Sequence, residues 1–308
     1  LAATDINDRW QEAFKQALDS DDFDLAKSLL DLAESQSIAP NPESIARYQA
    51  AMSPANVGKR WAGDFYAGAS TGEASGPAGL AGALTADLSG LGDLRDLVRE
   101  GQKIAQGEEP DELVLGLAAV GLVATGATIA SFGLAAPARG GVTTLKMAAR
   151  AGKISGPLRI HVTRLARDLI DHDQVRLVAR SAKTLDLNAA RAALGASIRP
   201  TAFREIGDMA GDLARITTKS SARSAQEALA LARDPGELRR IARLAETRGT
   251  TTRAVVKLFG RAAIVLTASA LTLTSWVMAG LLWLAGALFV LAILARRTAL
   301  FIARRVPR

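Results

Sequence analysis

Residues 113–138 read LVLGLAAVGLVATGATIASFGLAAPA, and residues 262–295 read AAIVLTASALTLTSWVMAGLLWLAGALFVLAILA. Neither stretch contains an Asp, Glu, Lys or Arg over its 26 or 34 positions. Both are longer than the ~20 apolar residues that a helix needs to cross a bilayer. The sequence therefore predicts a helical integral membrane protein with transmembrane segments at 113–138 and 262–295.

Charge is sorted around these two segments. Residues 1–112 carry 9 Lys and Arg against 20 Asp and Glu, whereas residues 139–261 carry 24 against 11. The tail at 296–308 adds five Arg and no acid, which brings the formal net charge to +7. The domain prediction is an acidic arm at 1–112, a basic amphipathic region at 139–261 and a basic tail.

A basic chain binds either nucleic acid or an anionic membrane. Only 14 of the 308 residues are Phe, Trp or Tyr, which is poor material for a base-stacking surface. The basic residues flank apolar segments instead, so anionic lipid is the expected partner and nucleic acid is not. With no cysteine in the chain, disulfides, thiolate nucleophiles and cysteine metal sites are excluded.

The fold class predicted outside the two apolar segments is also all-α, because alternating strand patterns are nearly absent. Residues 4–36 have two apolar stripes at helical spacing, the first with Trp10 and Phe14, the second with Ala26 and Ala33. The acidic turn at 19–22 separates them. This helical hairpin resembles one tetratricopeptide unit, which implies a docking module, although an ordinary hairpin is the alternative and no second copy follows.

Further helices are expected at 41–60, begun by Pro42, and at 93–103. The glycine-rich stretch 62–92 is expected to be irregular or closely packed chain. The region 142–257 reads as a chain of amphipathic helices, with apolar stripes at Leu158, Val162, Leu165, Leu169 and at Leu238, Ile241, Leu244, Ala245. The first of these helices fits either an anionic lipid surface or a soluble bundle with solvated arginines. Both interpretations stay open.

The first apolar segment contains glycine at positions 116, 121, 126 and 133. Small residues spaced in this way let membrane helices approach closely. Acids at 108–112 precede it and suit a helix N-terminus, and Pro137 with Gly140 and Gly141 is expected to end it. As one helix the second segment would extend roughly 51 Å, so it must tilt, extend beyond the membrane or fold back, and one crossing is favoured. Trp276 and Trp283 would then face a protein neighbour or the membrane interface.

Two motifs suggest chemistry and both are weak. Residues 68–72 match the G-x-S-x-G string of a nucleophile elbow, but no convincing strand precedes Ser70. Asp168 and His172 lie four residues apart, yet one His with aspartates lacks the ligand set of a typical zinc site. The predicted sites are therefore none: no catalytic residue, no cofactor, no metal and no enzymatic activity.

The functional prediction is an accessory or scaffold subunit of a bacterial inner-membrane complex. Its transmembrane helices would pack against other integral membrane subunits and its acidic arm would dock outside the bilayer, with self-association left open. The alternative is a pore-forming or membrane-perturbing helical effector. The initial Leu1 suggests signal-peptide cleavage and a periplasmic arm, but the Arg-rich tail prefers the cytoplasm, which conflicts with two simple crossings.

Overall fold

The computed structural model describes residues 3–71, 78, 91–130, 136–169 and 199–265. Every regular element in this part of the chain is a helix and none is a strand, so the all-α prediction is confirmed. The chain divides into two compact units, Leu1–Arg261 and Ala262–Arg308. Residues 266–308, which include Trp276 and Trp283, lie outside the described residues.

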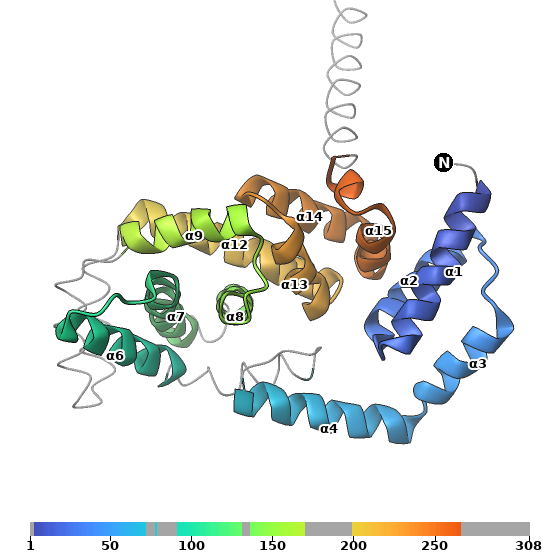
Figure 1. Cartoon of the computed structure of the whole chain (residues 1–308), viewed down its shortest axis with the longest axis horizontal. Coiled ribbons are helices and arrows are strands. Elements are labelled where there is room, and N and C mark those ends of the chain that lie inside the picture. Colours follow the sequence, from blue (N-terminus) through green and yellow to red (C-terminus); the bar gives the residue numbers. More distant parts are fainter. Residues whose placement is uncertain (1–2, 72–77, 79–90, 131–135, 170–198, 266–308) are drawn as a thin grey trace, which may run out of the picture. The chain divides into compact units, whose positions relative to one another are not determined.

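The N-terminal hairpin consists of α1, Ala3–Asp19, and α2, Phe23–Gln36 (Figure 1), as the sequence predicts. Trp10 and Phe14 are fully buried and stack with their ring centroids 5.0 Å apart. The indole Nε1 of Trp10 donates a hydrogen bond to the Leu29 carbonyl over 2.8 Å, so the buried ring leaves no unpaired donor. Asp22 caps α2 by accepting from the Leu25 amide, and left-handed Ser37 ends it.

Two helices follow where one was expected. Helix α3 spans Pro42–Ala51 and α4 spans Pro54–Thr71, so the predicted helix at 41–60 is broken before Pro54. A proline removes a backbone donor and restrains the preceding residue, which explains the break. Residues 62–71, which were expected to be irregular or closely packed chain, are instead helical, because α4 continues through Gly63 and Gly68.

The main bundle is built around α7, Glu112–Ala130, and α8, Ala136–Arg150. Helix α7 packs against α6, Leu91–Gln106, against α8, and against α9, Gly156–Leu169 (Figure 1). Asp111 accepts hydrogen bonds from the amides of Leu113 and Val114, which confirms that an acid caps this helix. Seven apolar side chains of α7 are buried in the unit: Leu113, Leu115, Leu117, Ala118, Ala119, Val120 and Leu122.

Helix α8 corrects the expected end of the first apolar segment. Pro137, Gly140 and Gly141 all lie inside this helix rather than after a longer one. Proline is tolerated in a first helical turn, where its missing donor would be unpaired anyway. A Cβ on Gly141 would lie 1.9 Å from the Ala210 carbonyl oxygen of α12, Pro200–Lys219, so this glycine is required for the close approach of α8 and α12.

The glycines of α7 have a similar role. A Cβ on Gly116 would lie 2.4 Å from the Ala166 Cβ of α9, and one on Gly121 would lie 2.6 Å from the Asp93 carboxylate of α6. The predicted small-residue face is therefore used, at these two positions, for packing within the chain. The prediction for the other two glycines is not covered, because the side chains of residues 126–130 and the whole of Gly133 lie outside the described part of the structure.

The unit ends with α13, Ala222–Leu231, α14, Pro235–Arg248, a 3₁₀ turn at Gly249–Thr251, and α15, Thr252–Phe259. Asp234 caps α14 through the Glu237 amide, as predicted. The predicted stripes of α9 and α14 are buried in the unit, while Arg159, Arg164 and Arg167 are exposed. For α9 the structure therefore supports the bundle interpretation. Within the described residues, no helix combines the length and apolarity that membrane spanning requires.

Candidate functional site

Ser70 does not lie in a nucleophile elbow. The residues 68–71 form the last turn of α4, and the chain before them is helical back to Pro54. An elbow needs a strand that ends in a strained turn, so this geometry removes the basis of the motif match.

The second motif is only partly described. Asp168 lies on α9, whereas His172 and the residues around it fall outside the described residues. The other histidine, His161, places its Nε2 2.8 Å from Oε1 of Glu205 on α12. In the part of the chain that the structure describes, no three His, Asp or Glu residues are grouped as metal ligands would be.

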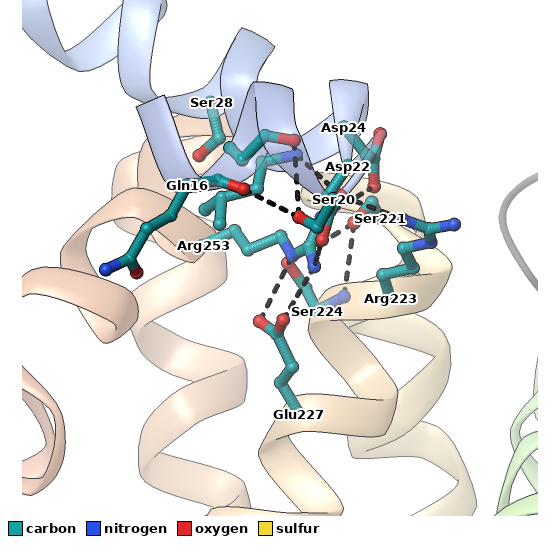
Figure 2. Close-up of polar contacts among 12 residues, drawn as sticks. Gln16, Ser20, Asp22, Asp24, Ser28, Ser221, Arg223, Ser224, Glu227 and Arg253 are labelled. Atoms are coloured by element: carbon teal, nitrogen blue, oxygen red, sulfur yellow. Dashed lines mark hydrogen bonds and ion pairs between the residues drawn. The ribbon is translucent and has the colours of Figure 1, made fainter. Parts of the chain in front are cut away.

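A polar cluster surrounds Arg253 on α15, and Figure 2 shows its guanidinium between two carboxylates. Nη1 and Nη2 donate to the two oxygens of Asp22 over 2.6 and 2.5 Å. Nε and Nη2 also donate to Glu227 on α13 over 3.1 and 2.6 Å. Arg223 adds a second cation 2.9 Å from Asp22. The cluster therefore joins α2, α13 and α15, which are distant in sequence.

The electrostatics of this cluster keep Asp22 and Arg253 charged. Burial alone would raise the pKa of Asp22, but the hydrogen bonds and charge of Arg253, together with the charge of Arg223, lower it below its ordinary value. Burial would lower the pKa of Arg253, and the bonds to Asp22 and Glu227 raise it instead. Bidentate guanidinium–carboxylate pairs are among the strong hydrogen bonds in proteins, so this is a rigid joint.

Neighbouring contacts extend the joint. The Ser28 hydroxyl donates to the Thr250 carbonyl over 2.6 Å and accepts from the Ala254 amide over 2.9 Å (Figure 2 labels Ser28). Arg9 on α1 donates to the Leu258 carbonyl. Ala254 and Leu258 also belong to the same hydrophobic cluster as Trp10 and Phe14. Helix α15 is thus bound to the N-terminal hairpin by apolar, polar and ionic contacts together.

A second charge layer lies between α6 and α8. Lys146 forms a close pair with Asp93 and lies 3.8 Å from Asp96, while Arg150 forms a close pair with Asp96. Arg139 Nη2 lies 3.9 Å from Asp93 Oδ2. The side chains of Asp93, Arg139 and Lys146 are 2–3% exposed, and burying such charges is costly unless they are matched. These ion pairs link α6 to α8 through long side chains, beside the packing of both helices on α7.

Neither network was predicted from the sequence, although the network between α6 and α8 corresponds to a recognisable pattern of charges. Asp93, Asp96 and Glu100 share one face of a helix, and Arg139, Lys146 and Arg150 share one face of another. Facing rows of opposite charge on two predicted helices indicate a pair of neighbours. No comparable pattern links Asp22 to Arg253, because neither belongs to such a row.

The two networks are arranged to hold helices together, since each buried charge that they contain faces an opposite one.

Comparison of the chain with protein-family models, with curated proteins and with solved structures gave no match.

Proposed function

We propose that this chain is a non-catalytic accessory or scaffold subunit of a bacterial inner-membrane complex. The segment 262–295 crosses the membrane once and packs against other integral subunits, and the acidic N-terminal hairpin docks a partner outside the bilayer. The tetratricopeptide-like pattern of the hairpin suits this docking role, since such units bind other proteins through their helical surfaces.

One observation carries the proposal. The hairpin is clamped by Arg253 onto α15, and α15 leads within three residues into the uncharged segment that begins at Ala262. The joint therefore ties the proposed docking module to the last helix before the proposed anchor. A loosely tethered hairpin would need no buried bidentate joint.

The packing of α7 within the first unit supports a path with one crossing. The apolar residues at 113–122 have protein neighbours in α6, α8 and α9. With a single crossing, an Arg-rich tail that prefers the cytoplasm leaves the first unit outside the bilayer on the opposite side.

The docking test uses exposed acids of the hairpin. Glu12→Lys with Glu34→Lys should remove a partner that otherwise co-purifies in stoichiometric amount from native membranes in mild detergent, detected by mass spectrometry. Glu108→Lys with Glu109→Lys makes the same charge change on an exposed loop outside the hairpin and should retain the partner. A wild-type chain that purifies with no stoichiometric partner would overturn the proposal.

A second candidate is the membrane-perturbing effector, and the burial of α7 is what favours it. A helix that is apolar after its first residue, and is enclosed by more polar helices, could be released later to insert into a membrane. Asp96 pairs with Lys146 and Arg150, so Asp96→Asn should loosen α6 from α8 and speed dye release from anionic vesicles. If neither the wild type nor this variant releases dye, the second candidate is eliminated.

A further inference from the structure

A surface pocket of about 450 Å³ opens between α6, the loop before α7, and the turn from α8 to α9. Its size is within the range of small-molecule sites. Five of its lining side chains are cations: Arg95, Arg99, Lys103, Arg150 and Arg159. Three acids also line it: Asp96, Glu100 and Asp111. Cations exceed acids, although α6 belongs to the acidic part of the sequence.

The three acids are already engaged. Asp96 pairs with the buried Lys146 and with Arg150, which also lines the pocket. Glu100 accepts from Lys103 Nζ and from the Asp111 amide, each over 2.8 Å. The carboxylate of Asp111 caps α7. The side chains of Asp96 and Glu100 are about 5% and 4% exposed, so they form the floor and fix the inner cations rather than the mouth.

The outer cations are available to a ligand. Arg95 and Arg99 lie one helical turn apart on α6, with side chains 75% and 74% exposed. Each approaches a floor carboxylate only to 3.9 Å, beyond hydrogen-bond distance. Arg159 on α9 is exposed and makes no ion pair with any residue that the structure describes. Three guanidinium groups from two helices therefore border one opening.

We propose that this pocket binds a phosphate group, either as a phosphorylated lipid headgroup or as a free phosphate ester. Guanidinium groups match the oxygens of phosphate with paired, charge-assisted hydrogen bonds. Three guanidinium groups together match the charge of a phosphate dianion better than they match the single charge of a carboxylate ligand. The lining contains no aromatic ring on which a base would stack, which favours a headgroup or a small phosphate ester over a nucleotide. The pocket belongs to the first unit, and the proposal does not depend on the scaffold function.

The test uses the purified full chain in neutral detergent. Calorimetric titration with inorganic phosphate and with glycerol 3-phosphate measures binding of the free group. Flotation with phosphatidylcholine vesicles, with and without phosphatidic acid, measures binding of the headgroup. Binding in the calorimetric arm assigns a free phosphate ester, and binding only to phosphatidic acid vesicles assigns a lipid.

The pocket variant is Arg95→Gln with Arg99→Gln, and a second variant is Arg159→Gln. Each should weaken binding at least about tenfold, the scale for a lost hydrogen bond to a charged group. The matched control, Arg164→Gln with Arg243→Gln, removes two exposed arginines outside the pocket and should bind as wild type. Circular dichroism should show unchanged helix content, since all these side chains are exposed.

Two results would overturn the site. Absence of binding in both arms contradicts it directly. Equal weakening by the control and the pocket variants would show attraction by overall charge, without a defined pocket. Both results are independent of partner co-purification, so failure of the pocket and failure of the scaffold proposal are distinguishable.

Discussion

Nη2 of Arg253 donates a hydrogen bond to Oδ2 of Asp22 over 2.5 Å, across 231 positions of sequence. The side chain of Arg253 is 4% exposed and that of Asp22 is 17% exposed. Because the same guanidinium also binds Glu227, one residue joins the start of α2 to α13 and α15. Arg253 supplies the ionic part of the attachment of the N-terminal hairpin to α15, beside the contacts of Arg9 and Ser28 and the shared apolar cluster.

Arg253→Gln should therefore destabilise the attachment of the hairpin by about 3 kcal/mol, since breaking a buried pair leaves uncompensated carboxylates. Amide hydrogen exchange in α1 and α2 should accelerate more than exchange in α8 and α12. The matched control is Arg47→Gln, which removes the exposed pair with Asp19, in which the two side chains are 53% and 51% exposed. This change should cost less than about 1 kcal/mol. Equal effects of the two variants would contradict the role of Arg253.

The same pair predicts sensitivity to acid. The pKa of Asp22 is lowered in the fold from its ordinary value of 3.8, so its contribution to stability is present above 3.8 and is lost as the pH falls through the lowered folded pKa. The difference in unfolding free energy between wild type and Asp22→Asn should thus be largest at neutral pH and shrink in acid. Denaturant titrations at several pH values measure it, and a difference that grows in acid would refute the assignment.

For Asp212 on α12 we expect the opposite dependence of stability on pH. Burial raises its pKa above 3.8 despite its pairing with Arg215 and the nearby Arg239. A raised pKa means that the folded state binds the proton more tightly, so this contribution is fully present below 3.8 and is lost as the pH rises through the folded pKa. Relative to Asp212→Asn, the wild type should gain stability as the pH is lowered. The same titrations test this, and parallel behaviour of the Asp22 and Asp212 variants would show the prediction to be wrong.

Two glycines allow the effect of close helix packing on stability to be distinguished from the effect of backbone entropy. Gly141→Ala would place a methyl group against the Ala210 carbonyl and force α8 from α12, so a loss of roughly 1–3 kcal/mol is expected. Gly207→Ala on α12 meets no atom within 4 Å and should stabilise by about 0.4–1 kcal/mol by reducing the entropy of the unfolded chain. Thermal unfolding of the two variants compares them directly. A neutral Gly141→Ala would contradict the close helix contact.

Local patterns predicted the helices whose faces they define. The stripes of α9 and α14, the acidic turn before α2 and the cap at Asp234 need only residues within a few positions of each other. The extent of α4 was not predictable in this way, because Gly63 and Gly68 lower helix propensity by about 1 kcal/mol each without forbidding a helix.

Other features are set by the tertiary fold. A helix such as α7, which is apolar after Glu112, has the same composition whether it is enclosed by lipid or by α6, α8 and α9, so the sequence alone leaves both environments open. The pairing of Asp22 with Arg253 depends on a chain reversal that no local pattern encodes. The cation pocket likewise combines residues of α6 and α9, which lie in oppositely charged parts of the sequence.

The proposed topology gives the last prediction, and the cysteine-free chain makes it direct to test. Single cysteines at Ser35 on α2, Arg243 on α14 and Thr298 in the tail report three parts of the chain, and the first two positions are exposed. With one crossing, an impermeant maleimide should label Ser35→Cys and Arg243→Cys in intact cells and label Thr298→Cys only after permeabilisation. The labelling of Ser35→Cys and of Arg243→Cys must agree, because both positions belong to the first unit. Helix α7 lies between them in sequence, but in this topology it packs within that unit and does not cross the membrane. Labelling of Ser35→Cys with protection of Arg243→Cys would mean that the segment 113–138 crosses the membrane, and the one-crossing path would be rejected.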